Sequence, residues 1–373
     1  MMSMLWKRIL KIIVLVIIIG ISLFLLLLLR LSSVRWASIS RQERHLEELR
    51  ELYQQDYDPV DEQAFANFDL DDPSIRLNEI RMIASHNSYK TRGTDIGKFF
   101  VGLGDSFEEA KALKYANPPL TEQLDKGIRS FELDVRYRRD TFEAIHVPLV
   151  DNGSTAVNLT LAFEEIALWS EHNPNHVPIL LLLEFKDDWM MLDPALKPIE
   201  AAEFALFDTL LQESFGETLY TPSDLMGSHS SIQARLQSES WPTLQELRGK
   251  ILVILHPGDF IDPYMATDPD LSELSMFPGM SNLDVDAPYA AFVVHNDPDV
   301  EAIESLLEQH LIVRTRIDSG LIRDSDTIQA AMDSGAQIMS TDFHPAHLFK
   351  DETYQYLEEE YTVVLNDVLL PGE

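Results

Sequence analysis

From residue 80 onward, short runs of β-branched and aliphatic residues alternate with segments of helical periodicity. This alternation limits the possible folds more than any other feature, because strands that alternate with helices form parallel sheets. The runs expected to be strands cover residues 80–85, 130–137, 142–147, 178–186, 250–256, 290–296, 311–317 and 336–343. The helices expected between them include residues 120–127, 159–172, 199–216, 299–310 and 326–335.

Eight strands of this kind in one domain predict an α/β fold, a (β/α)₈ TIM barrel. One connection cannot be regular. The strand expected at 142–147 follows the strand at 130–137 too closely to leave room for a helix. We therefore expect an irregular barrel at that point.

An uncharged apolar run near the N-terminus, residues 12–29, is long enough to cross a bilayer as a helix. A cleaved signal peptide has a shorter apolar core and then a small-x-small site, which the following "RLSSVRWAS" offers only weakly. We therefore favour a single transmembrane anchor over a signal peptide. Basic residues flank the run on both sides, so the positive-inside rule does not decide its orientation.

The chain divides into four predicted parts. Residues 1–37 form the membrane anchor, residues 38–77 a helical and acidic stalk and linker, residues 78–350 the barrel, and residues 351–373 an acidic tail. The stalk is predicted because Leu46, Leu49 and Leu52 follow helical spacing.

The charge of the chain is uneven. Residues 1–50 carry 8 Lys/Arg and 3 Asp/Glu, which leaves 29 − 8 = 21 basic and 62 − 3 = 59 acidic residues for the remainder. Such an acidic surface is a poor partner for nucleic acid, and an anionic substrate would need local cations. Cysteine is absent, which excludes disulfides, thiolate metal ligands and a cysteine nucleophile.

Acidic side chains lie where the catalytic face of a barrel is expected, at the carboxyl ends of its strands. Glu132 and Asp134 are two residues apart on one expected strand, so both point to the same face. Two carboxylates in one barrel mouth repel each other unless a cation lies between them. The simpler alternative is that they pair with Lys186 and Arg136.

Glu184 ends another expected strand, and Asn87 follows the first. With Glu132 and Asp134 they could form a set of four oxygen ligands. Such a set suits Ca²⁺ or Mg²⁺, whereas the lack of cysteine disfavours Zn²⁺.

Histidines and basic residues also lie at the ends of the expected strands. His86 and His146 are the candidates for acid–base catalysis, because imidazole titrates near neutral pH and both lie at the rim of the expected metal site. A structural role is the alternative for any single histidine. The candidates for contacts with the substrate are Lys186, Arg314, Arg316, His256 and His295. Arg314 and Arg316 share a face, so either both point inward or both form surface salt bridges.

The stretches "SHNSY", "FELDVR", "IHVP" and "LLEFKDD", in this order, resemble the bacterial Ca²⁺-dependent phosphatidylinositol-specific phospholipase C-like family of the PLC-like phosphodiesterase superfamily. The resemblance covers roughly residues 78–345, and the combination of motifs is specific although each motif alone is weak. One departure is "IHVP", where many relatives have His-Gly; this concerns the loop after His146 rather than its imidazole.

The resemblance implies a TIM-barrel phosphodiesterase that needs Ca²⁺. Its catalytic histidines correspond to His86 and His146, and its calcium ligands to four residues of this chain: Asn87, Glu132, Asp134 and Glu184. The implied reaction cleaves a phosphatidylinositol-type phospholipid to diacylglycerol and a cyclic inositol phosphate. Because such relatives are commonly exported and external Ca²⁺ is abundant, the resemblance implies an extracytoplasmic catalytic domain tethered to a membrane.

Two alternatives stay open at the level of the sequence. The same barrel serves phosphodiesterases that act on glycerophosphodiesters or on sphingolipid head groups, although glycerophosphodiesterases typically carry His-Arg-Gly rather than "SHNSY" after the first strand. The other alternative is a membrane-tethered Ca²⁺-binding barrel without activity.

Overall fold

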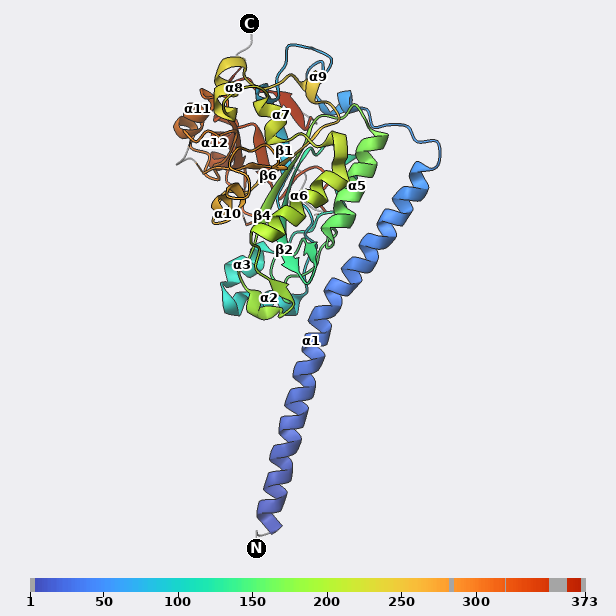
Figure 1. Ribbon diagram of the computed structural model, residues 1–373. Helices are drawn as coiled ribbons and strands as arrows, with labels where there is room; N and C mark the ends of the chain where they lie inside the picture. The colour runs from blue at the N-terminus through green and yellow to red at the C-terminus, as the bar shows by residue number, and fades with distance from the viewer. Residues whose placement is uncertain (1–3, 282–284, 319, 349–360, 370–373) are drawn as a thin grey trace.

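The computed structural model describes residues 4–281, 285–318, 320–348 and 361–369. Its centre is a barrel of eight parallel strands with helices outside it (Figure 1). The strands are β1 (Ile80–Ser85), β2 (Ser130–Arg138), β4 (Ile179–Phe185), β6 (Ile251–Leu255), β7 (Met276–Pro278), β8 (Phe292–Val294), β9 (Ile312–Arg316) and β10 (Ile338–Thr341).

The strands follow one another in the order β7-β6-β4-β2-β1-β10-β9-β8. A parallel bridge between Met280 and Val293 joins the two ends of this order. The strand residues are buried on both faces, as in the run "ILLLL" of β4, because helices cover the outside and side chains fill the inside. The predicted TIM barrel is therefore confirmed.

One predicted strand is not part of the barrel. Residues 141–143 form β3 (Thr141–Glu143), which pairs antiparallel with the end of β2, as does β5 (Leu196–Lys197). β2 instead pairs directly with β4, and the eighth strand of the barrel is β7, which lies next to β6 and which the sequence analysis missed. Three residues that end in proline give no periodic signal, whereas the apolar "FEAIHV" looked like a strand.

The predicted helices are present with slightly different ends, as α4 (Leu120–Leu124), α5 (Leu159–His172), α6 (Ala201–Phe215), α11 (Val300–Leu307) and α12 (Ser325–Asp333). Shorter elements fill the longer connections: α7 (Pro222–Met226), α8 (Ile232–Glu239), α9 (Leu244–Leu247), α10 (Ile261–Met265), and the 3₁₀ turns at Glu62–Phe65, Leu77–Glu79, Met190–Leu192 and Gly216–Thr218. The segment after β1 holds two helices that we did not predict, α2 (Asp95–Gly104) and α3 (Phe107–Ala112).

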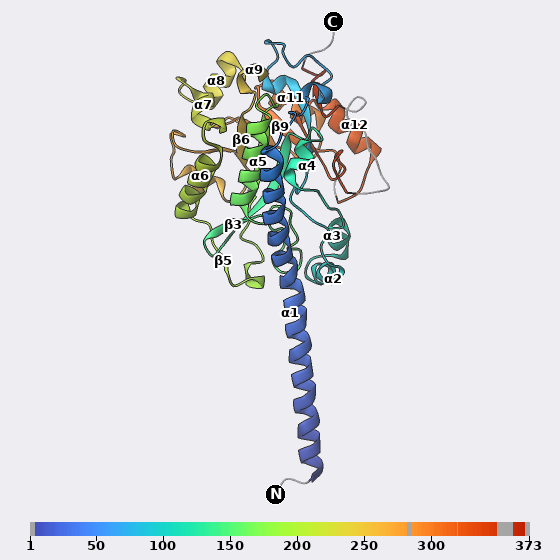
Figure 2. The ribbon, with the colours of Figure 1, turned by 90° about the vertical axis from the view of Figure 1, so that its right-hand side faces the viewer.

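A single helix, α1 (Met4–Tyr53), contains both the apolar run and the predicted stalk. Its first half projects away from the barrel, and its second half lies along α5 (Figures 1 and 2). By length and composition it is the one helix among the described residues that could cross a membrane. Its buried side chains form a stripe on the barrel side: Leu31, Ser38, Gln42, Leu46 and Leu49.

Two features bear on the predicted division of the chain. The helix α1 passes without a break through the boundary expected at residues 37–38. In the predicted tail, β11 (Val363–Leu365) pairs antiparallel with β1, so this part belongs to the sheet. The remainder of the division stays a prediction.

Candidate active site

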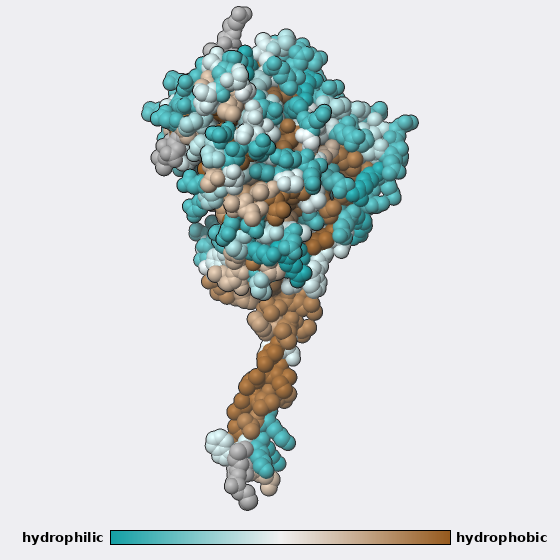
Figure 3. Space-filling model, viewed as in Figure 1, coloured by the Kyte–Doolittle hydropathy of each residue, from teal (hydrophilic) through white to brown (hydrophobic). Residues whose placement is uncertain are grey.

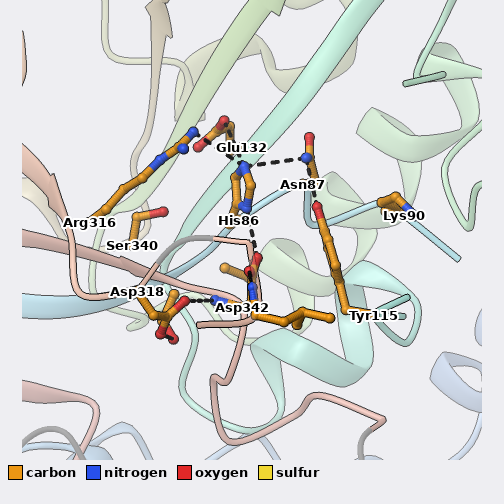
Figure 4. A network of polar contacts seen from close by, with 12 residues as sticks. His86, Asn87, Lys90, Tyr115, Glu132, Arg316, Asp318, Ser340 and Asp342 are labelled. Carbon is orange, nitrogen blue, oxygen red and sulfur yellow. Dashed lines mark hydrogen bonds and ion pairs between the residues drawn. The ribbon is translucent and has the colours of Figure 1, made fainter. Parts of the chain in front are cut away.

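His86 stands at the carboxyl end of β1, beside the end of β10. The two strands are paired in register, Ser85 with Thr341, so the residues that follow them meet. His86 donates from Nδ1 to Oδ1 of Asp342 at 2.7 Å (Figure 4). Asp342 is buried, and its other oxygen accepts from the backbone N–H of Leu321 at 3.2 Å. A carboxylate on Nδ1 leaves the Nε2 atom of neutral His86 as a proton acceptor.

The residues around Nε2 of His86 come from its own turn and from two further strands, β2 and β9. Asn87 Nδ2 lies 3.3 Å from it, Arg316 Nη2 3.4 Å, and Glu132 Oε1 3.8 Å. The ring also stacks on Tyr115, with the centroids 5.9 Å apart. The acceptor nitrogen therefore faces a polar space at the barrel mouth rather than the core.

The turn after His86 depends on the left-handed backbone of Asn87, whose φ is 45°. Asparagine tolerates this conformation better than most residues. The Asn87 side chain donates to Tyr115 Oη at 2.7 Å, and Asn117 donates to the Asn87 carbonyl at 2.9 Å. Ser88 Oγ accepts from the backbone N–H of Glu132 at 2.9 Å, which fixes the turn to β2.

Glu132 and Asp134 both point into the mouth, as predicted, but in different surroundings. Glu132 pairs with the guanidinium of Arg314. Burial alone would raise the pKa of Glu132, but the charges of Arg314 and His86 outweigh burial and hold that pKa well below its usual value. Asp134 is buried, and neither carboxylate oxygen has a hydrogen-bond partner in the described part of the chain. Burial, helped by the charge of Glu184, raises the pKa of Asp134 to about 6.

Glu184 lies directly beside Asp134, because the two are register partners of β4 and β2. Lys186, two residues further on β4, places Nζ 2.6 Å from Glu184 Oε1 and 3.8 Å from Asp134 Oδ2. The second distance is a charge contact and too long for a hydrogen bond. Of the alternative pairing of Glu132 and Asp134 with Lys186 and Arg136, the structure has the contact between Asp134 and Lys186, whereas Arg136 pairs with Asp188.

The four predicted metal ligands face the same mouth without forming a closed site. Among the described residues, no group of three or more His, Cys, Asp or Glu is close enough to hold a metal ion. The chemistry of the donors nevertheless fits a hard divalent cation. Asp134 presents two buried oxygens without a hydrogen-bond donor among the described residues, Glu184 lies beside it, and all the candidate ligands offer oxygen.

His146 lies in the loop after β3 rather than on a strand. Its Nδ1 donates to Asp151 Oδ2 at 3.2 Å. Asp151 is buried and also pairs with the buried ammonium of Lys90, 3.2 Å away. Burial opposes ionisation, but Lys90 and His146 hold the pKa of Asp151 below its ordinary value. His146 therefore has a carboxylate behind Nδ1, as His86 has.

Arg136 holds this loop from the strand side. It follows Glu132 and Asp134 on the inward face of β2, and it donates to the carbonyls of Ile145 at 3.0 Å and His146 at 2.8 Å. It also pairs with Asp188 at 2.6 Å. Sequence reasoning singled out neither this role nor Lys90 and Asp151, although "HVPLVD" places an acidic residue five positions after His146.

The two histidines share one mouth. Glu132 Oε1 lies 3.8 Å from His86 Nε2, and Arg136 donates to the carbonyl of His146 at 2.8 Å. Because Glu132 and Arg136 lie on one face of β2, the two histidines stand on the same side of the barrel.

The two predicted arginines also face inward, and they differ in how many of their polar atoms are already hydrogen-bonded. Arg314 is buried and bound to Glu132, Asn296 and Ser340, so its guanidinium is already occupied. Arg316 keeps a buried Nε without a hydrogen-bond partner among the described residues. A cavity of about 460 Å³ borders Arg316, with carboxylates and an amide in its wall, including Asn296, Asp297, Asp318 and Asp324.

His256 and His295 follow β6 and β8. Burial lowers the pKa of His256, and the charges of Glu184 and Glu132 oppose this shift. Its Nδ1 contacts the carbonyl of Pro257 at 2.8 Å. His295 has a buried Nε2 without a hydrogen-bond partner in the described chain. Their contact with a substrate stays a prediction.

Comparisons with known proteins agree with this geometry. Residues 75–141 and 136–368 match the family "phosphoinositide phospholipase C, Ca²⁺-dependent". The apo form of a calcium-dependent phosphoinositol-specific phospholipase C from Pseudomonas sp., a Gram-negative bacterium, is 19% identical with a TM-score of 0.55, and the match covers 82% of this chain and 99% of that one. A myoinositol complex of that enzyme matches with the same identity and TM-score and covers 83% and 99%.

A Ca²⁺-dependent phosphatidylinositol-specific phospholipase C from Streptomyces antibioticus is 17% identical with a TM-score of 0.53, over 73% of this chain and 96% of that one. At such identities these likenesses show the fold. No curated protein matches the sequence.

Proposed function

Because this chain belongs to the family of Ca²⁺-dependent phosphoinositide phospholipases C, we propose that it is a phosphodiesterase of the phospholipase C type. Its substrate would be a phosphatidylinositol-type lipid, and its products diacylglycerol and a cyclic inositol phosphate. Family and fold support a phosphodiesterase; the lipid, the products and the roles of single residues are the proposal.

The observation that carries the proposal is the pair of histidines at one mouth, each with a buried carboxylate on Nδ1. Asp342 orients His86 at 2.7 Å, and Asp151 orients His146 at 3.2 Å. Such a carboxylate fixes the tautomer of an imidazole and stabilises its protonated form. The cleavage of a phosphodiester by an internal hydroxyl needs one group that accepts a proton and one that donates a proton, and two oriented imidazoles can supply both.

In the proposed reaction, the inositol 2-hydroxyl gives its proton to a base, and its oxygen forms a bond to phosphorus. The base is His86 Nε2 or a carboxylate of the mouth. The bond between phosphorus and the glyceryl oxygen breaks, and protonated His146 gives its proton to that oxygen. Arg316, 3.4 Å from His86 Nε2, would neutralise charge on the phosphoryl group.

Asn87, Glu132, Asp134 and Glu184 would hold the calcium ion that the family implies. When bound, Ca²⁺ would lower the pKa of the attacking hydroxyl and neutralise charge that develops on phosphorus. The buried oxygens of Asp134 favour this assignment, because they have no hydrogen-bond donor among the described residues. Lys186 would then contact a phosphate oxygen when it leaves Glu184.

The cavity beside Arg316 suits a polyhydroxylated head group. Its volume is about 460 Å³, and Asp297, Asp324 and Asn296 offer acceptors for ring hydroxyls. We place α1 in a membrane as a single anchor and the barrel outside the cytoplasm, since a site of this kind suits the millimolar Ca²⁺ found there.

The test measures products from phosphatidylinositol vesicles with the full chain, with and without Ca²⁺. Diacylglycerol and cyclic inositol phosphate that appear only with Ca²⁺ would support the proposal. Ca²⁺ binding without cleavage of any phospholipid in a panel would favour the inactive barrel, and cleavage of other head groups alone would correct the substrate.

Calorimetry tests the metal ligands separately. Asp134→Asn keeps the shape of the side chain and removes its charge, and we expect Ca²⁺ affinity to fall at least tenfold. The matched control is Asp208→Asn, a buried carboxyl on α6, outside the barrel, that accepts from Tyr264 at 2.9 Å. An equal affinity in both variants would remove Asp134 from the metal site.

A further inference from the structure

Large apolar side chains are exposed at the end of the domain where α1 leaves it. They belong to α2, α3 and the 3₁₀ turn after β4: Ile96, Phe99, Leu103, Phe107, Trp189 and Met191. We call them the apolar rim. Figures 1 and 2 show α2 and α3 beside α1 at this end, and Figure 3 shows apolar surface there that adjoins the helix. Soluble surfaces rarely gather so many apolar groups without a partner.

A cleft of about 340 Å³ lies between α1 and the rim. Phe24 and Leu28 of α1 form one wall, and Phe100, Val150, Trp189 and Leu192 line the other side. The lining is almost wholly apolar, and its volume falls in the range of small-molecule sites, about 300–1,000 Å³.

The position of the cleft along α1 matches the depth of a bilayer interface. Phe24 lies five residues before Leu29, the last residue of the apolar run, which corresponds to about 7.5 Å along a helix axis. Interfacial elements enter a membrane by roughly 5–10 Å. If α1 crosses a bilayer with residues 12–29, the cleft opens within the leaflet that α1 leaves.

Contacts further along α1 fix the position of the barrel relative to the apolar run of this helix. Arg35 pairs with Glu143, and Gln42 exchanges two hydrogen bonds with the backbone of Asn158, at 2.8 and 2.9 Å. His45 contacts Thr121 at 3.0 Å. Because α1 is one continuous helix, the same contacts set the distance between the rim and the membrane.

We propose that the cleft binds an acyl chain of a lipid in the bilayer that α1 crosses, while the apolar rim rests in the same leaflet. The argument for this occupant is continuity, because the cleft shares Phe24 and Leu28 with the membrane-spanning run. Val147, Leu149 and Val150 also line the cleft and lie between His146 and Asp151. A bound chain would brace the loop that carries His146, so the barrel would act on lipids of its own membrane. This consequence rests on the proposed function; the lipid site rests on α1 as anchor.

The absence of cysteine allows a direct test of depth, because each introduced cysteine is a unique labelling site. Spin labels at Leu103→Cys and Phe107→Cys, in the full chain reconstituted in phosphatidylcholine vesicles, should be accessible to oxygen and shielded from an aqueous nickel complex. The control is Leu206→Cys, a similarly exposed apolar position on α6, whose label should be accessible to the aqueous nickel complex. Rim labels that resemble the control would overturn the proposal. Neither Ca²⁺ nor activity is needed, so a failure of the proposed function gives a different result.

The cleft itself is tested through Trp189. Vesicles with brominated acyl chains should quench the emission of Trp189. The quenched part of the emission should therefore be lost in Trp189→Phe and retained in Trp36→Phe. Leu28→Phe, which fills the α1 wall without adding a tryptophan to the apolar run, should reduce this quenching at least twofold. It should also lower kcat/KM on vesicles about tenfold and leave a water-soluble inositol phosphodiester unaffected. Equal quenching in the wild type and Trp189→Phe would refute the acyl-chain site.

Discussion

The two histidines reach the same mouth by different structural means. His86 and Asp342 are 256 residues apart in the chain, and the register of β1 and β10 brings them together. His146 and Asp151 are five residues apart on one loop. Asp342 is held by the backbone N–H of Leu321, whereas Asp151 is held by the buried ammonium of Lys90. One imidazole thus depends on the sheet, and the other depends on a buried ion pair.

Because of this difference, substitutions should separate effects on the orientation of an imidazole from effects on the stability of the fold. Loss of a contact at His86 should change the chemistry and leave the barrel intact, because strand pairing places the residues. Loss of Lys90 behind the His146 loop should affect chemistry and folding together, because the buried carboxylate of Asp151 would keep its charge without a counter-ion, which is costly. The predictions below, from the largest expected effect to the smallest, test this distinction.

Removal of either imidazole should have the largest effect. We expect His86→Ala and His146→Ala each to lower kcat on phosphatidylinositol by about 10²–10⁴-fold, the usual contribution of a positioned acid or base. Their melting temperatures should stay near that of the wild type, because both side chains are partly exposed. Near-normal turnover in either variant would remove that histidine from the reaction.

Lys90→Met should cost about 3–5 kcal/mol of unfolding free energy, because it leaves Asp151 buried without its counter-ion. The double variant Lys90→Met/Asp151→Asn removes the orphaned charge and should recover much of that loss without recovering activity. The control at His86 is Asp342→Asn. It keeps an acceptor for the backbone N–H of Leu321 and should lower the unfolding free energy by less than about 1 kcal/mol. Denaturant unfolding measures all three; equal losses at Lys90 and Asp342 would contradict the distinction.

Acid should lower the stability of the structure around His86, because it protonates His344. This buried imidazole donates to Asn117 at 2.9 Å, and Asn117 in turn holds the Asn87 carbonyl. Burial lowers the pKa of His344 to about 3, so its stabilising contribution is complete above the unfolded value near 6.5 and is lost as pH falls toward 3. One proton taken up on unfolding corresponds to about 1.4 kcal/mol per pH unit.

Thermal unfolding between pH 7 and 4 measures this slope. His344→Gln keeps a donor for Asn117 and cannot take up a proton, so its slope should be smaller. His176, with a pKa lowered to about 4 by burial, contributes a parallel slope in both proteins. Identical slopes would exclude His344 as the acid-sensitive group.

Ser88→Ala should have the smallest effect, about 1–2 kcal/mol. It removes the acceptor of the buried Glu132 N–H and a hydrogen bond to the Ser85 carbonyl at 2.9 Å. Because β1 still places His86, kcat should change less than threefold. A larger fall in kcat than in stability would show that the turn, rather than the strand, orients His86.

Sequence periodicity located most of the barrel, because parallel strands are buried on both faces and form apolar runs such as "ILLLL". It failed at β7, where three residues carry too little pattern, and at β3, where an apolar stretch pairs antiparallel outside the barrel. It also missed α2 and α3, whose apolar residues are largely exposed.

The inward residues of the site were predictable for the same geometric reason. Alternation along β2 predicts that Glu132 and Asp134 share one face, and in the structure they contact Arg314 on β9 and Lys186 after β4. The partners behind the histidines were not predictable, because Asp342 meets His86 only through sheet closure, and Lys90 meets Asp151 only through the folding of two loops. Single-sequence patterns do not report such distant contacts.

The bridge between Met280 and Val293 has a consequence for the order in which the molecule opens. β4 is paired along its length with β2 on one side and β6 on the other, whereas β7 and β8 meet, within the described chain, only through that bridge. Native-state amide exchange should therefore be faster at Met280 and Val294 than at the centre of β4. The cylinder has a seam there, on the wall opposite the pairing of β1 and β2, and a local opening at this seam would leave both histidines in place.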